Sequence, residues 1–97
     1  MAKWHVYIVR CSNGTLYTGI ATDVHRRIAE HGRLDGKGAK YLRGKGPLEV
    51  VLARAVGTRS LALRVECQIK KLTKAQKEQI IARKSRLNHI IKNICNP

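Results

Sequence analysis

The sequence predicts an α+β fold, with a small three-stranded antiparallel or mixed β-sheet flanked by helices. Three short β-branched or aromatic runs predict the strands, and the segments between and after them show caps and helical apolar spacing. The element order is ββαβααα, and with 97 residues, 43% of them hydrophobic, the chain is long enough for one core. We expect a single domain over residues 1–97, with its core in about 3–82 and a C-terminal helix at about 86–95.

The strands follow from residue type and from one turn signal. Residues 4–10, WHVYIVR, are β-branched and aromatic and predict the first strand. The dipeptide Asn13-Gly14 tolerates the positive φ of a tight hairpin, so residues 15–21, TLYTGIA, are expected to return as the second strand. Residues 48–56, LEVVLARAV, predict the third strand.

The helices are predicted from their caps and spacing. Thr22 or Asp23 is expected to cap the first helix, which Gly32 ends. Residues 32–46 contain five glycines and five basic residues and predict a loop. Three further helices are expected over residues about 59–72, about 74–84 after Thr73, and about 86–95. In the last of them an apolar stripe is formed by Leu87, Ile90, Ile91 and Ile94.

The charge is strongly basic. Twenty Lys and Arg against six Asp and Glu give a formal net charge of +14, and such an excess repels itself unless an anionic partner neutralises it. Nucleic acid is the expected partner, because phosphate contacts release counterions; a basic surface that is merely solvated is the alternative. In the glycine-rich loop, the candidate contacts to backbone phosphates are Lys37, Lys40, Arg43 and Lys45.

Other classes are disfavoured. The three cysteines are widely spaced and form no CxxC pair, which argues against a disulfide framework or a zinc site. No apolar run approaches the roughly 18 residues of a membrane span, and the N-terminus carries no cleavage signal. The segment GRLDGKG lacks a Ser or Thr after Lys37 and follows a helix, so it is not expected to bind a nucleotide. We therefore expect a cytoplasmic protein that does not contact membranes.

The first helix carries charge on its apolar face. Val24 and Ile28 mark this face, and Arg27 and His31 fall on it at helical spacing. Either Arg27 extends its head into water, or it lies at the rim of a cleft and directs its fork at a phosphate. His31 either satisfies the last helix carbonyls or shares the rim as a proton carrier or phosphate ligand.

Glu66 is expected near the buried edge of its helix. The apolar residues around it at helical spacing are Ala62, Val65 and Ile69. Glu66 either pairs with an arginine such as Arg27 or binds a metal, since Mg²⁺ often uses one protein carboxylate together with waters and phosphate oxygens.

Two tyrosines lie on the predicted hairpin, where Tyr7 and Tyr17 are able to approach across the strands. Strand tyrosines are usually packing residues. The reference pKa of about 10 makes a tyrosine a poor base at neutral pH, although surrounding positive charge and a metal would lower that pKa.

Four segments taken in order resemble a GIY-YIG nuclease domain: VYIVR, LYTGIATDVHRRIAEH, GAKYLRGKGPLEVV and ALRVE. The resemblance covers about residues 3–82 and is close to the small stand-alone bacterial members, whose role is largely uncharacterised. The two half-motifs are HVY at 5–7 and YTG at 17–19, where His5-Val6 replaces Gly-Ile and Thr18 replaces Ile. No asparagine stands close after Glu66, where several members use one.

The resemblance implies an endonuclease that hydrolyses DNA phosphodiester bonds with a single divalent ion, Mg²⁺ or Mn²⁺. Glu66 would hold the ion and Arg27 would stabilise the developing charge. Tyr7 is the first choice to activate the attacking water, with Tyr17 and His31 assisting.

The expected selectivity is for structure rather than sequence, because phosphate contacts carry no base information. By family analogy the substrates are branched, nicked or flapped DNA, in a role such as DNA repair, and RNA stays open as a substrate. One alternative is a non-catalytic nucleic-acid-binding module that keeps the fold. Another is an adaptor that docks on an acidic protein or ribosomal RNA through its C-terminal apolar helix.

Overall fold

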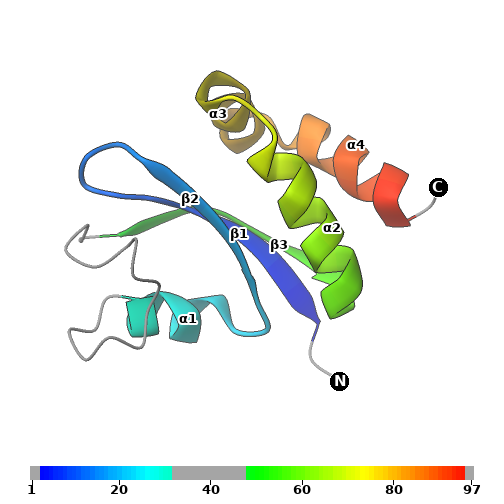
Figure 1. The fold of residues 1–97 in the computed structure, drawn as a ribbon, viewed down its shortest axis with the longest axis horizontal. Coiled ribbons are helices and arrows are strands. Elements are labelled where there is room, and N and C mark those ends of the chain that lie inside the picture. The colour runs from blue at the N-terminus through cyan, green and yellow to red at the C-terminus, as the bar shows by residue number, and fades with distance from the viewer. Residues whose placement is uncertain (1–2, 32–47, 96–97) are drawn as a thin grey trace.

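The computed structural model describes residues 3–31 and 48–95, apart from the side chains of Glu30 and His31. Within these ranges the elements follow the predicted order ββαβααα, and their bounds lie within two residues of the predicted ones (Figure 1). The strands are β1 (Trp4–Arg10), β2 (Leu16–Ala21) and β3 (Glu49–Gly57). The helices are α1 (Val24–His31), α2 (Arg59–Lys70), α3 (Lys74–Ala82) and α4 (Lys84–Cys95).

The sheet has the strand order β2-β1-β3, and both pairings are antiparallel. The β1–β2 turn is the predicted hairpin, because Gly14 adopts a φ of 86° and its N–H donates to the Cys11 carbonyl at 2.9 Å. The register places Tyr7 opposite Gly19. In the described part of the chain β1 is the central strand, which leaves β2 at one edge of the sheet and β3 at the other.

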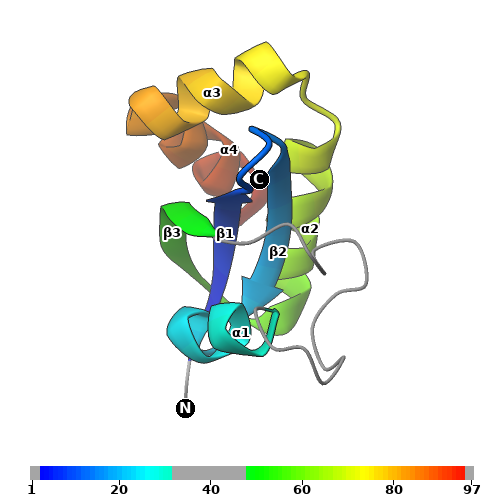
Figure 2. The same ribbon diagram turned by 90° about the vertical axis from the view of Figure 1, so that its left-hand side faces the viewer.

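The sheet has a helix layer on each face (Figures 1 and 2). Successive strand residues point to opposite faces, so Val6 and Ile8 of β1 lie under α2, α3 and α4, whereas Tyr7 and Val9 face α1. On the first face the helices contribute Val65, Ile69, Ile80 and Leu87 to the core. On the second face, Val24 and Ile28 of α1 pack over the strands.

The N-terminal caps of α1, α2 and α3 are formed by residues that lie next to each helix in the sequence. The Asp23 carboxylate accepts the Arg26 N–H at 3.1 Å, so Asp23 rather than Thr22 caps α1. Thr58 accepts the Leu61 N–H at 3.2 Å. Thr73 and Gln76 form a reciprocal capping box.

The apolar stripe of α4 is used inside the fold. Leu87 is buried, and its partners on the stripe pack against the same core; they are Ile90, Ile91 and Ile94. This packing disfavours an adaptor that docks through the apolar face of α4. Among residues 3–31 and 48–95, no helix has the length and apolar character to cross a bilayer.

Candidate active site

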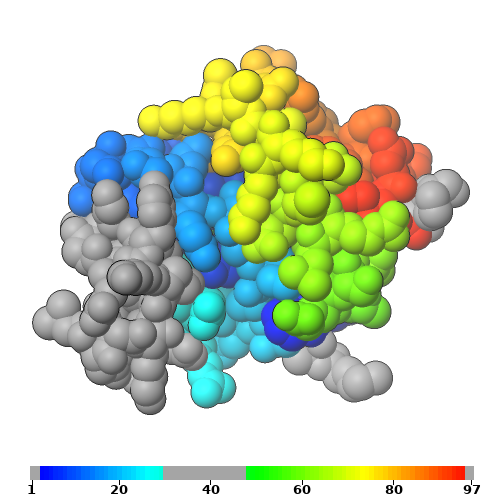
Figure 3. Space-filling model, in the orientation of Figure 1, coloured from blue at the N-terminus to red at the C-terminus, as the bar shows by residue number. Residues whose placement is uncertain are grey.

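A cleft of about 440 Å³ opens along the edge strand β2, between α1 and α2. Figure 3 shows the face on which β2 (blue) lies recessed beside α2 (yellow-green). Four of the five predicted catalytic residues line it, together with two residues that sequence reasoning did not single out. They are Tyr7, Tyr17, Arg27 and Glu66, and then Trp4 and Arg59.

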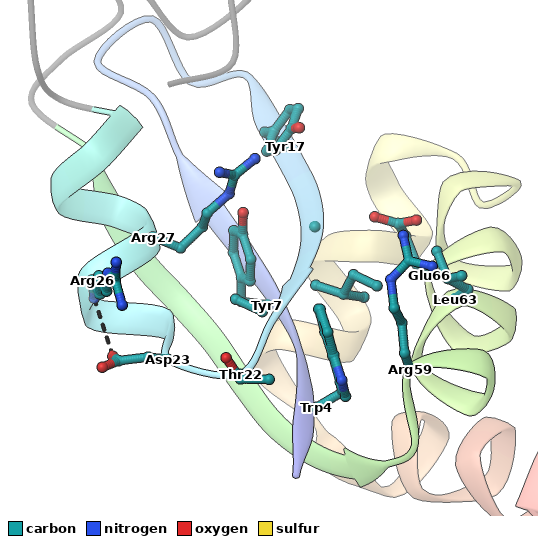
Figure 4. A pocket seen from close by; sticks show the side chains of 13 residues that line it. Trp4, Tyr7, Tyr17, Thr22, Asp23, Arg26, Arg27, Arg59, Leu63 and Glu66 are labelled. Atoms are coloured by element: carbon teal, nitrogen blue, oxygen red, sulfur yellow. Dashed lines mark hydrogen bonds between the residues drawn. The ribbon is translucent and has the colours of Figure 1, made fainter. Parts of the chain in front are cut away.

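These side chains come from both faces of the sheet. Tyr7, Tyr17 and Arg27 lie on the α1 side of β2, whereas Glu66 projects from α2 on the other side (Figure 4). They share one cleft because β2 is an edge strand, and a ligand that lies across its edge is able to contact both sides.

The position of Tyr7 depends on Gly19. Tyr7 is 1% exposed and lies directly opposite Gly19 in the hairpin register. A Cβ on Gly19 would lie 2.5 Å from the Tyr7 hydroxyl oxygen and 2.6 Å from its Cζ atom. The glycine therefore gives the ring room to lie across β2, and any larger residue would displace it.

Burial controls the pKa of Tyr7. Desolvation raises this pKa above 10.0, the nearby Tyr17 and the Glu66 charge add to the rise, and a hydrogen bond with Arg27 and its charge oppose it. Positive charge does lower the pKa, as the sequence indicates, but in the protein alone the effect of Arg27 is smaller than that of desolvation. At neutral pH Tyr7 is therefore a phenol that keeps its proton.

Arg27 lies in the cleft rather than extending away from it. Val24 and Ile28 anchor α1 against the cluster around Tyr7 and Val9, which turns the half-buried Arg27 toward the two tyrosines (Figure 4). Its hydrogen bond with Tyr7 fixes a guanidinium beside the phenol. Arg27 lies on the apolar face of α1 because that face packs against the strands beside the cleft, and the arginine extends into the cleft from there.

Glu66 is the cleft carboxylate on α2. Its side chain is 17% exposed and forms an ion pair with Lys70, one turn further along, at 3.7 Å. The sequence left open a pair with Arg27, and the ion pair described for Glu66 is with Lys70 instead. Because Lys70 is 52% exposed, this pair is a weak, solvent-screened contact.

The donor set fits a divalent ion only in part. Among the residues described, no group of three or more His, Cys, Asp or Glu side chains is placed to hold a metal. A protein-only cage is therefore not present in this part of the chain. One partly buried carboxylate in a cleft does fit Mg²⁺ or Mn²⁺, which take their other ligands from water and phosphate oxygens.

For the remaining predicted site residues, the structure describes no side chain. His31 ends α1, but its side chain is not among those described. The four basic loop residues fall in the range 32–47, also outside the described residues; they are Lys37, Lys40, Arg43 and Lys45. Arg59 was not predicted, although its spacing with Leu63 and Glu66 (i, i+4, i+7) places it on the stripe of α2 that carries the carboxylate.

Residues 3–79 match the family described as the GIY-YIG catalytic domain. The chain is 57% identical over 82 residues to a UPF0213 protein of Cronobacter sakazakii, covering 84% of each chain. It is 46% identical over 97 residues to the UPF0213 protein YhbQ of Salmonella typhimurium, covering 100% of this chain and 95% of that protein. The solution NMR structure of a UPF0213 protein from Bacillus halodurans is similar in fold, with a TM-score of 0.53 and 44% identity over 82% of this chain and 83% of that one.

Proposed function

Because this chain belongs to the GIY-YIG catalytic domain family, we propose that it is a metal-dependent endonuclease that hydrolyses DNA phosphodiester bonds. The observation that carries the proposal is the convergence of Tyr7, Tyr17, Arg27 and Glu66 in one cleft. A packing role explains a buried tyrosine. It does not explain why an arginine and a carboxylate from two helices line the same opening.

Arg27 is the group that binds the phosphate to be cut. Its guanidinium is already held in the cleft by the contact with Tyr7, so little side-chain freedom is lost when a phosphate arrives. Two parallel N–H donors suit a phosphate, and a donor fixed in advance stabilises the charge that develops on the oxygens during attack.

Glu66 is the residue proposed to hold the divalent ion. An ion bound there supplies Lewis-acid stabilisation of charge on the phosphate oxygens. The partial burial of the carboxylate, at 17% exposure, limits the competition from solvent. In the free protein Lys70 offsets only part of the carboxylate charge, because their contact is screened by solvent.

Tyr7 is the proposed base for the attacking water. Its raised pKa means that only a small fraction is phenolate at neutral pH, and below the pKa this fraction rises about tenfold for each unit by which the pH increases. Cleavage is therefore expected to accelerate with rising pH. Tyr17, on the same side of the cleft, is proposed to orient the water, and His31, at the end of α1, is proposed to assist.

Substrate binding is proposed to rest on phosphate contacts. The net charge of +14 supports this, as do the seven Lys and Arg in residues 70–86. The loop residues Lys37, Lys40, Arg43 and Lys45 are proposed to contact the same backbone. Such contacts carry no base information, so we propose selectivity for branched, nicked or flapped DNA and not for sequence.

The proposed location is the cytoplasm. The free thiols of Cys11, Cys67 and Cys95 are compatible with its reducing conditions.

The test is cleavage of labelled single-stranded, duplex, nicked, flapped and branched DNA in Mg²⁺, Mn²⁺ or EDTA. We expect wild-type cutting that needs the metal, rises with pH, and falls at least about a hundredfold in Glu66→Gln and in Arg27→Ala. The matched control is Glu49→Gln, since Glu49 is a carboxylate with 70% exposure on β3, outside the described lining of the cleft.

The raised pKa of Tyr7 also favours a second candidate, a binding module that keeps the fold without cutting. That candidate predicts tight DNA binding, no products under any metal, and unchanged or improved binding in Glu66→Gln. Cutting that persists in Glu66→Gln would contradict the metal-ligand assignment.

A further inference from the structure

On the α2 side of the cleft, an arginine lies over an aromatic ring. The Cζ atom of Arg59 is 5.7 Å from the centroid of the Trp4 ring, within cation–π range. Trp4 is half-buried and Arg59 is exposed, and both line the cleft that contains Glu66. The ring therefore holds a guanidinium at the cleft wall without removing it from solvent.

Arg59 and Glu66 share one stripe of α2. They are seven residues apart, about two turns and roughly 10 Å along the helix axis, with the 37% exposed Leu63 between them. In Figure 4 the Arg59 side chain extends past Leu63 in the direction of Glu66. Since the ion pair described for Glu66 is with Lys70, Arg59 is not needed as its counter-ion.

The start of α2 also attracts anions. Its first turn contains no acidic residue, so the charge of Arg59, the first helical residue, adds to the partial positive charge of the helix end. Thr58 satisfies one backbone donor there, through the Leu61 N–H. The Arg59 end of this wall therefore favours a negatively charged group, whereas the Glu66 end carries a carboxylate.

We propose that Arg59 is a substrate-binding residue that holds the backbone phosphate adjacent to the one being cut, and that Trp4 positions its guanidinium for this contact. The inference rests on the nucleic-acid substrate of the proposed function. Arg27 lies on the α1 side of β2 and Arg59 on the α2 side, so a strand that crosses β2 meets a guanidinium on each side. An arginine stacked on a ring keeps its N–H edges available for a phosphate.

The experiment compares Arg59→Ala with Arg64→Ala. Both positions are exposed arginines on α2, and of the two only Arg59 is among the described lining residues. Affinity for a labelled flapped DNA is measured in EDTA at several salt concentrations. For Arg59→Ala we expect affinity about tenfold lower and a salt slope smaller by about one unit, with a much smaller loss in Arg64→Ala.

Two further variants separate binding from packing. Arg59→Lys keeps the charge and the salt slope but loses the fork, so its affinity is expected between wild type and Arg59→Ala. Trp4→Phe keeps a ring but weakens the cation–π contact, and we expect a smaller affinity loss with an unchanged slope. A structural role for Arg59 would lower thermal stability without altering the salt slope, and that result would overturn the proposal.

The assay in EDTA requires no cleavage, so the two proposals fail separately. If wild type cuts DNA while Arg59→Ala matches Arg64→Ala in affinity and slope, the nuclease stands and the Arg59 contact is refuted. If wild type does not cut but Arg59→Ala selectively loses affinity, the nuclease fails and the contact is supported. With a cutting wild type, we expect a raised KM and a kcat within about threefold for Arg59→Ala.

Discussion

The two faces of the sheet are covered very differently. On one face, three helices bury an aliphatic core in which Val65, Ile69 and Ile80 are 0% exposed. On the other face, the eight-residue α1 covers the strands with two half-buried residues, Val24 and Ile28, and the cleft opens beside it.

The two faces differ in what their buried side chains contribute. The face under α2, α3 and α4 contains side chains whose burial stabilises the fold, by roughly 25 cal/mol per Å² of apolar surface removed from water. The α1 face instead buries a phenol against a guanidinium, an arrangement that burial alone does not favour. Most of the fully buried aliphatic side chains described therefore lie on the face under α2, α3 and α4.

The largest loss of stability is expected from Ile69→Ala, and Ile28→Ala truncates the same residue type on the other face for comparison. Ile69→Ala should lower the free energy of unfolding by about 2–5 kcal/mol, because Ile69 is fully buried and leaves a cavity. Ile28→Ala, at a half-buried position on α1, should cost under about 1.5 kcal/mol. Urea unfolding measures both, and equal losses would mean that the two faces contribute alike.

Gly19→Ala comes next, since it disturbs the α1 face from within the sheet. The added Cβ meets the Tyr7 ring, and relieving that overlap should cost about 1–3 kcal/mol and lower the cleavage rate at least tenfold by moving the hydroxyl.

Thr18→Val is the matched control for Gly19→Ala, one residue away on the opposite face of β2. Thr18 is 3% exposed, and its hydroxyl has no hydrogen-bond partner within the described residues, so its replacement should be neutral or stabilising. An active and fully stable Gly19→Ala would show that Tyr7 does not depend on this close approach.

Much of the fold could be predicted from the sequence because its signals are local. Asn13-Gly14 gave the hairpin and Thr73 the start of α3, and the bounds fell within two residues. Leu87 with its isoleucines gave the buried stripe of α4.

The site could be predicted only in part. The family motif selected Tyr7, Arg27 and Glu66, but no local pattern reveals that β2 is an edge strand around which two faces share one cleft. The contact between Trp4 and Arg59 joins residues 55 positions apart, and only the tertiary fold brings them together. The net direction of the Tyr7 pKa shift depends on burial, and a count of nearby charges does not give the burial of a side chain.

Among the variants expected to lose activity, Tyr7→Phe should have the smallest effect on stability at neutral pH, because it keeps the ring and removes only the hydroxyl. The lost hydrogen bond with Arg27 should cost about 0.5–1.5 kcal/mol, whereas cleavage should fall to background. A variant that cuts normally would remove Tyr7 from the proposed chemistry and leave it as a packing residue.

The same variant reveals how burial acts on Tyr7 at alkaline pH. The folded pKa is raised above 10.0 by desolvation, so above that pH the unfolded chain loses the proton while the folded chain still holds it. Unfolding then becomes more favourable as pH rises, and the stabilisation present below pH 10 is lost as the pH passes the folded pKa.

Tyr7→Phe has no such proton, and lysine and arginine titrations are common to both proteins. The difference in unfolding free energy between wild type and Tyr7→Phe should therefore shift against wild type from about pH 10 upward. A difference that stays constant from pH 8 to 11 would mean that the Arg27 contact offsets burial and that the phenol is accessible as a base in the free protein.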